Sequence, residues 1–234
     1  MGTALLILLE TLYDCHVSGI ILIGCDYLSI RSSLNNRIPH VWIDCNDAPE
    51  DTQHICQVQS DQYVAGQMAA DLFFRKGSRR PLVFCGSRHT HRDKDRISGF
   101  CSVYENKGYP VSDRQICFLP EIKPHVVESQ DMVRYLLTKG EFFDGIFAIS
   151  DGRAIGAYLG LREHGIRIPE AVKLMAFDGI AEANVSVLNI TSIHQNVNLI
   201  TRRACETFIE LIKGNPIEEK RILVPTDILS GQTV

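Results

Sequence analysis

The chain has 234 residues, 45% hydrophobic and 22% charged, an ordinary globular composition that allows one large domain or two lobes of moderate size. Its formal net charge of -4, from 24 basic and 28 acidic residues, argues against a chain that grips a nucleic-acid backbone by itself. The eight cysteines form no Cys-x-x-Cys pair, and most lie inside apolar runs. We therefore expect free thiols in a reducing compartment, with neither zinc nor disulfides.

The apolar N-terminal stretch, residues 1–12, does not have the pattern of a signal peptide. It has no basic segment before it, Glu10 and Asp14 interrupt it, and no small-residue cleavage site follows. No apolar run in the chain reaches the roughly 18 residues that a membrane span needs. The sequence therefore predicts a cytoplasmic chain with no membrane partner.

Strands and helices are predicted to alternate along the whole chain. Helices are expected at residues 4–13, 29–36, 61–76, 95–107, 128–137, 154–164 and 199–213. Extended segments are expected at residues 17–23, 39–44, 57–60, 81–86, 115–119, 145–150, 172–177, 191–195 and 221–229. This alternation predicts an α/β fold with parallel sheets and right-handed crossovers, and we found no linker between its parts.

Residues 144–195 carry the clearest functional pattern. Three short apolar runs here each end in polar residues: Ser150-Asp151, Asp178 and Gln195. Buried parallel strands have this pattern when their carboxyl ends open into a ligand crevice. We found no nucleophile–base constellation and no glycine-rich phosphate loop, so we expect no enzyme and no cofactor. His89 and His91 lack a third ligand nearby, and we expect no metal site.

In order and spacing, these features resemble the effector-binding region of the LacI/GalR family of bacterial repressors. The matching segments are 17–22, 38–44, Ser60-Asp61 with Gly66, Lys76-Gly77, the loop ending Arg96-Ile-Ser-Gly-Phe100, and 144–195. The resemblance implies a periplasmic-binding-protein-like fold of type I, with two Rossmann-like lobes. The expected N-terminal lobe is 1–79 with 196–224, and the expected C-terminal lobe is 80–195 with 225–234.

The resemblance also implies a set of ligand-binding residues, all of which face the crevice between the lobes in that family. They are Asp61, Thr90, Arg92, Arg96, Ser150, Asp178 and Gln195. The planar guanidinium of Arg96 presents several N–H donors in a fixed arrangement that suits paired sugar hydroxyls. The Asp178 carboxylate accepts two hydroxyl hydrogen bonds at once.

Other roles remain open for several of these residues. Asp61 fits a helix cap as well as a ligand contact, and Gln195 fits a hinge between the lobes as well as a contact. Arg92 is larger than the family's short polar residue at that place. It would either shrink the pocket or favour an acidic or phosphorylated effector.

The leading hypothesis is the effector-sensing and dimerising region of a LacI-type transcriptional repressor, with a sugar or sugar derivative as effector. By this resemblance the chain lacks the helix-turn-helix domain through which such a repressor binds DNA, and also the first βαβ unit of its N-terminal lobe. We expect a homodimer, and an exposed sheet edge that reduces solubility. The alternative is a stand-alone solute-binding protein of the transport type. An upstream helix-turn-helix would decide for the repressor, and a hydrophobic leader for the transporter.

Overall fold

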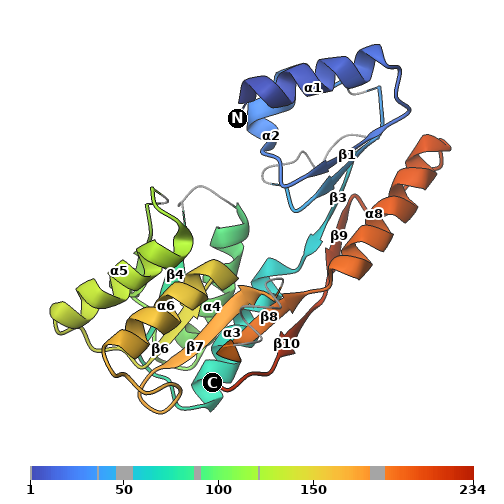
Figure 1. Cartoon of the computed structure of the whole chain (residues 1–234). Coiled ribbons are helices and arrows are strands. Elements are labelled where there is room, and N and C mark those ends of the chain that lie inside the picture. The colour runs from blue at the N-terminus through green and yellow to red at the C-terminus, as the bar shows by residue number, and fades with distance from the viewer. Residues whose placement is uncertain (1, 36, 46–54, 87–90, 121, 180–187) are drawn as a thin grey trace. The chain divides into compact units, whose positions relative to one another are not determined.

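The computed structural model describes residues 2–35, 37–45, 55–86, 91–120, 122–179 and 188–234 (Figure 1). The chain divides into two compact units, one formed by Met1–Asp61 with Asn196–Pro225 and the other by Gln62–Gln195 with Thr226–Val234. Each unit contains a parallel sheet with helices packed on it, which confirms the predicted α/β class with two parallel-sheet lobes. Among the described residues, no helix is both long enough and apolar enough to cross a membrane.

The first unit is built on a four-stranded parallel sheet in the order β1-β2-β3-β9. Its strands are β1 (Ile20–Ile23), β2 (His40–Ile43), β3 (Ile55–Ser60) and β9 (Arg221–Val224). Its helical segments are α1 (Gly2–Asp14), α2 (Tyr27–Ile30), the 3-10 turn η1 (Arg31–Ser33) and α8 (Val197–Ile212).

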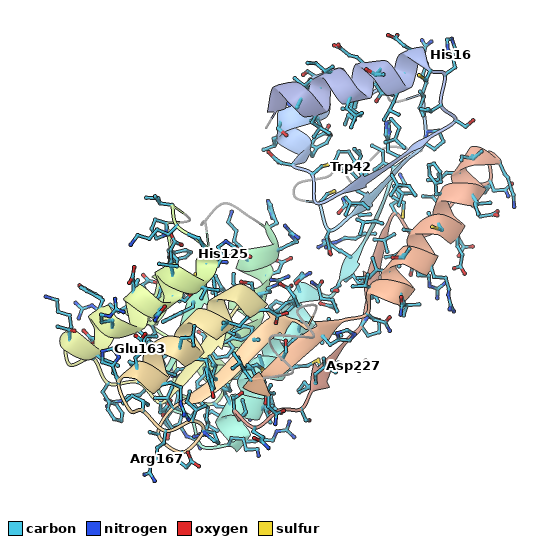
Figure 2. The ribbon with its side chains drawn as sticks, in the orientation of Figure 1. His16, Trp42, His125, Glu163, Arg167 and Asp227 are labelled. Atoms are coloured by element: carbon cyan, nitrogen blue, oxygen red, sulfur yellow. The ribbon has the colours of Figure 1, made fainter. Side chains whose placement is uncertain are left out.

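Strand β2 of this unit is covered on both faces. Val41, fully buried, packs in one cluster with Ile200 of α8. Trp42, labelled in Figure 2 and 1% exposed, packs in another cluster with Leu9 of α1. Because successive strand residues point to opposite faces, a continuous apolar run is what two-sided burial requires.

The second unit has a six-stranded sheet in the order β10-β8-β7-β6-β4-β5, parallel except for β10. Its strands are β4 (Pro81–Cys85), β5 (Ile116–Phe118), β6 (Gly145–Ala148), β7 (Lys173–Asp178), β8 (Thr191–Gln195) and β10 (Thr226–Leu229). Its helices are α3 (Gln62–Arg75), α4 (His91–Asn106), α5 (His125–Thr138) and α6 (Asp151–Glu163), with a 3-10 turn η2 (Asp113–Gln115).

Two helix pairs enclose this second sheet (Figure 1). Helices α3 and α4 pack through Phe73 and Phe100 on a face that includes Phe147 and Phe177. Helices α5 and α6 pack on the other face, against alternate residues of the same strands such as Ile146. The strand ends are thereby held at fixed positions by two apolar layers.

Two segments differ from the sequence-based expectation. Helix α3 lies in the second unit, whereas we expected residues 62–79 in the N-terminal lobe; the reason is its close packing on α4, which involves Gly66 and Gly99. The segment 221–229, which we expected to be one extended segment, is two strands separated at Pro225. Strand β9 pairs with β3, and β10 pairs with β8. Proline has no N–H to donate to a sheet, so it suits the break.

Candidate ligand-binding site

The carboxyl ends of the parallel strands in the second unit bring polar side chains to one edge of the sheet. Strand β7 ends at Asp178 and the neighbouring β8 ends at Gln195, while Ser150 follows β6. In open α/β sheets, ligands bind outside this edge of the sheet. The pattern that the sequence predicted for residues 144–195 is therefore present in the structure.

Arg96 of α4 lies at the centre of this edge and is only 6% exposed. Its Nε donates to Gln62 Oε1 at 2.6 Å, and its Nη1 donates to the Ile149 carbonyl at 2.7 Å. Its guanidinium carbon lies 3.6 Å from the centroid of the Phe177 ring. These contacts, including stacking on the ring face, fix the plane of the guanidinium before any ligand arrives.

Asp178 lies beside Arg96 and is held by Gln195. Its Oδ1 accepts a hydrogen bond from Gln195 Nε2 at 2.9 Å and lies 3.8 Å from Arg96 Nη2. The backbone of Asp178 has φ 103, a conformation that non-glycine residues rarely adopt and that costs about 1–3 kcal/mol. Strain of this kind, at a strand end that carries a polar side chain, is typical of functional sites.

The environment of Asp178 disfavours its charge. The pKa of this carboxyl is raised to about 6, chiefly by burial and also by the nearby Asp151 carboxylate, while Arg96, Gln195 and Arg92 act in the opposite direction. Its side chain is still 26% exposed. A carboxyl group in this state can accept hydrogen bonds and, near pH 6, also donate one.

Ser150 and Asp151 both make hydrogen bonds within the second unit. The Ser150 hydroxyl accepts a hydrogen bond from Arg153 Nη1 at 3.3 Å, and Arg153 also contacts His125, which is labelled in Figure 2 at the start of α5. Asp151 is buried and accepts from the Gly179 N–H and the Ser192 hydroxyl, each at 3.4 Å. Asp151, at the start of α6, therefore links the residue that follows β7 to β8.

The structure brings together three of the seven predicted residues by direct contacts: Arg96, Asp178 and Gln195. Ser150 lies on the same edge, one residue after the carbonyl that Arg96 binds. Arg92 lies one helical turn before Arg96 and is half-buried. Thr90 falls outside the described residues. Asp61 belongs to the first unit, where its backbone N–H donates to the Val224 carbonyl, directly before α3.

Two contributors to this site were not predicted from the sequence. Gln62 is 2% exposed and holds Arg96 through its amide oxygen, and Phe177 supplies the ring under the guanidinium. Phe177 reads in the sequence as an ordinary core residue of a buried strand. Gln62 carries no motif of its own, because its role arises only when α3 packs against α4.

The edge offers a fixed guanidinium, a carboxyl group and amides. This combination suits a small molecule rich in hydroxyls, because the hydroxyls pair with the polar groups. Within the described residues, no group of three or more His, Cys, Asp or Glu side chains is placed to hold a metal ion.

Comparison with known proteins identifies the family to which this fold belongs. The model of the periplasmic-binding-protein-like domain family matches residues 70–234. The chain belongs to this family. More specifically, it corresponds to the effector-binding part of LacI-type regulators, as the sequence resemblance implied. The relatives are regulators of transcription and not enzymes.

Three relatives illustrate the similarity. The chain is 26% identical over 225 residues to a ribose operon repressor of Halalkalibacterium halodurans, covering 96% of this chain but 65% of the repressor. A LacI-family regulatory protein from Chloroflexus aggregans has the same fold, with a TM-score of 0.83 and 19% identity, covering 97% of this chain and 81% of that one. A LacI-family regulator from Enterococcus faecium, solved with bound ribose, gives a TM-score of 0.81 and 20% identity, covering 98% and 84%.

Proposed function

We propose that this chain is the effector-sensing region of a LacI-type repressor, and that a sugar binds at the edge of the second unit formed by Arg96, Asp178 and Gln195. The observation that carries the proposal is the guanidinium of Arg96, which is buried, stacked on Phe177 and aimed beside a strained carboxyl group. Stability of the fold alone does not explain a buried cation at this edge, because burying a charge costs free energy unless the charge is paired and hydrogen-bonded.

The relatives support a sugar as the ligand class. One is a ribose operon repressor and another was solved with bound ribose. Hydroxyls of a sugar would accept hydrogen bonds from the Arg96 fork and donate to Asp178. A change in the DNA affinity of the repressor when the ligand binds, and homodimerisation of the chain, stay predictions that follow from the family resemblance.

A thermal-shift panel of pentoses and hexoses tests this proposal. A sugar present at about 100 times its Kd should stabilise the folded chain by about 2.7 kcal/mol, which for a chain of this size raises Tm by roughly 5–10 °C. Arg96→Gln and Asp178→Asn should each abolish most of the shift. Arg162→Gln, which removes an exposed cation from α6, should leave it unchanged.

Two outcomes would count against the proposal. One is a panel in which no sugar shifts the native chain. The other is a sugar whose shift survives both Arg96→Gln and Asp178→Asn, because the ligand would then bind elsewhere.

A further inference from the structure

Arg92 is a cation whose position the contacts described so far do not explain. It lies on α4, is half-buried, and its Nε is fully enclosed without a hydrogen-bond partner in the described part of the chain. Arg96 on the same helix has a partner for each of its donor groups. An enclosed N–H of a cationic side chain without an acceptor costs folding free energy, and an acceptor supplied by a ligand would offset that cost.

Arg92 is directed to the same place as Arg96. The two are four residues apart on one helix, and residues at that spacing lie on the same face. The charge of Arg92 also reaches Asp178, because it lowers the pKa of that carboxyl. Arg92 is therefore part of the electrostatic environment at the carboxyl edge of the sheet.

A second donor at this edge is also unfilled. Gln62 is 2% exposed and its amide oxygen is occupied by Arg96, but its Nε2 has no partner among the described residues. A buried amide N–H left without an acceptor costs about 1–3 kcal/mol. The edge thus holds two enclosed donors, one of them cationic, that lack an acceptor.

This inference rests on the proposed function. We propose that the ligand is an anionic sugar derivative, either a sugar acid or a sugar phosphate. Arg92 binds its charged group, and Gln62 donates a hydrogen bond to that group. Arg96, Asp178 and Gln195 then bind its hydroxyls. Guanidinium groups match carboxylate and phosphate in geometry, so the two anions share one recognition chemistry.

The test is a panel of matched sets, each with a free sugar, its aldonic acid and its phosphate ester, for the common pentoses and hexoses. Affinity is measured by thermal shift and then by calorimetry at pH 7.5. The native chain should bind one anion at least tenfold more tightly than its neutral parent. Arg92→Gln should weaken the anion by about 10- to 100-fold and the parent sugar by less than threefold.

Lys94→Gln is the matched control, because Lys94 is an exposed cation on the same helix, two residues away. It removes the same charge but should preserve the preference for the anion. Equal effects of the two substitutions would overturn the proposal. They would show that Arg92 attracts the anion only through the net charge of the protein and does not bind it directly. Comparison of the aldonic acid with the phosphate ester in each set shows which anion is the ligand.

A pH series gives an independent readout. Asp178 faces Arg92 and Arg96 of α4, Asp151 of α6 and Gln195 of β8, with His194 as its register neighbour on β8. Protonation of Asp178 near pH 6 removes a negative charge beside the bound anion. The affinity for the aldonic acid, divided by the affinity for its neutral parent sugar, should therefore rise severalfold from pH 7.5 to 5.5.

The outcomes separate this inference from the proposed function. Preferential binding of a neutral sugar, weakened by Arg96→Gln but not by Arg92→Gln, would refute the anionic ligand and leave the sugar sensor standing. A panel in which no compound binds would refute both.

Discussion

Asp178 combines backbone strain with burial of its carboxyl group. It is held at φ 103, its carboxyl group is withdrawn from most solvent, and its pKa is raised to about 6 because burial disfavours the charged form. Each of these features costs folding free energy. A position that a ligand does not use would gain stability from losing them, so their presence indicates a functional constraint.

This carboxyl group predicts an unusual dependence of stability on pH. Its folded-state pKa lies above the unfolded value, so between about pH 4 and 6 the native state binds more protons than the unfolded state. Stability from this group is therefore present at low pH and is lost as pH rises through about 6. Asp178→Asn should be more stable than the native chain at pH 7.5, by up to about 3 kcal/mol.

Urea unfolding of both chains from pH 4.5 to 7.5 measures the difference. The advantage of Asp178→Asn should shrink as pH falls toward 4.5. A variant that is less stable than the native chain at pH 7.5 would show that the carboxylate stabilises the fold, contrary to this account. The same comparison shows whether any loss of ligand binding in Asp178→Asn arises from unfolding.

At the residue scale, the sequence predicted the strand-end residues better than the residues around them. Asp178 and Gln195 follow apolar runs, and carboxyl ends of neighbouring parallel strands meet at one edge, so their proximity could be inferred. Arg96 came from a motif resemblance. Gln62 and Phe177 could not be predicted, because their contacts with Arg96 depend on how α3 and the sheet pack against α4.

At the element scale, the position of Arg96 depends on how closely α3 and α4 approach each other. A Cβ atom on Gly66 would collide with the carbonyl oxygen of Arg96, and one on Gly99 would collide with the carbonyl oxygen of Tyr63. Both collisions are with backbone, which cannot rotate away. The two glycines therefore allow the helix contact that sets Arg96 against Gln62.

The contrast between two Gly→Ala substitutions tests this packing. Gly99→Ala should lower the free energy of unfolding by about 3 kcal/mol, since the added methyl group forces the helices apart. Gly152→Ala in α6 meets nothing closer than 3.4 Å, and should be neutral or stabilise by up to about 1 kcal/mol because alanine favours the helix. Chemical denaturation of both variants provides the comparison. Equal stability of the two would mean that α3 and α4 do not pack this closely.

At the scale of the whole molecule, the chain passes between its two units after residues 61, 195 and 225. The sequence predicted two lobes without a linker, with the last two crossings after residues 195 and 224. It placed the first crossing after residue 79. A helix cap at Asp61 predicts where the helix begins, but it does not predict which of the two sheets the helix packs on. The choice is made by the interhelical contact of α3 with α4, which is a property of tertiary structure.

A hollow elsewhere in the same unit is another place where a ligand could bind. It has a volume of about 710 Å³, and its lining includes Arg80, Arg114, Lys139 and Phe142. These residues lie near the start of β4, β5 and β6, which is the opposite edge of the sheet from Arg96. A cationic hollow of this kind could also attract an anion, so affinity alone does not locate the site.

Hydrogen–deuterium exchange, with and without the compound that gives the largest thermal shift, tests the central claim most directly. The account predicts that the ligand slows exchange in peptides covering residues 145–153, 173–179, 191–196 and the first two turns of α4. Protection confined to residues 79–82, 109–115 and 135–143 would contradict it, because the ligand would then occupy the opposite edge of the sheet.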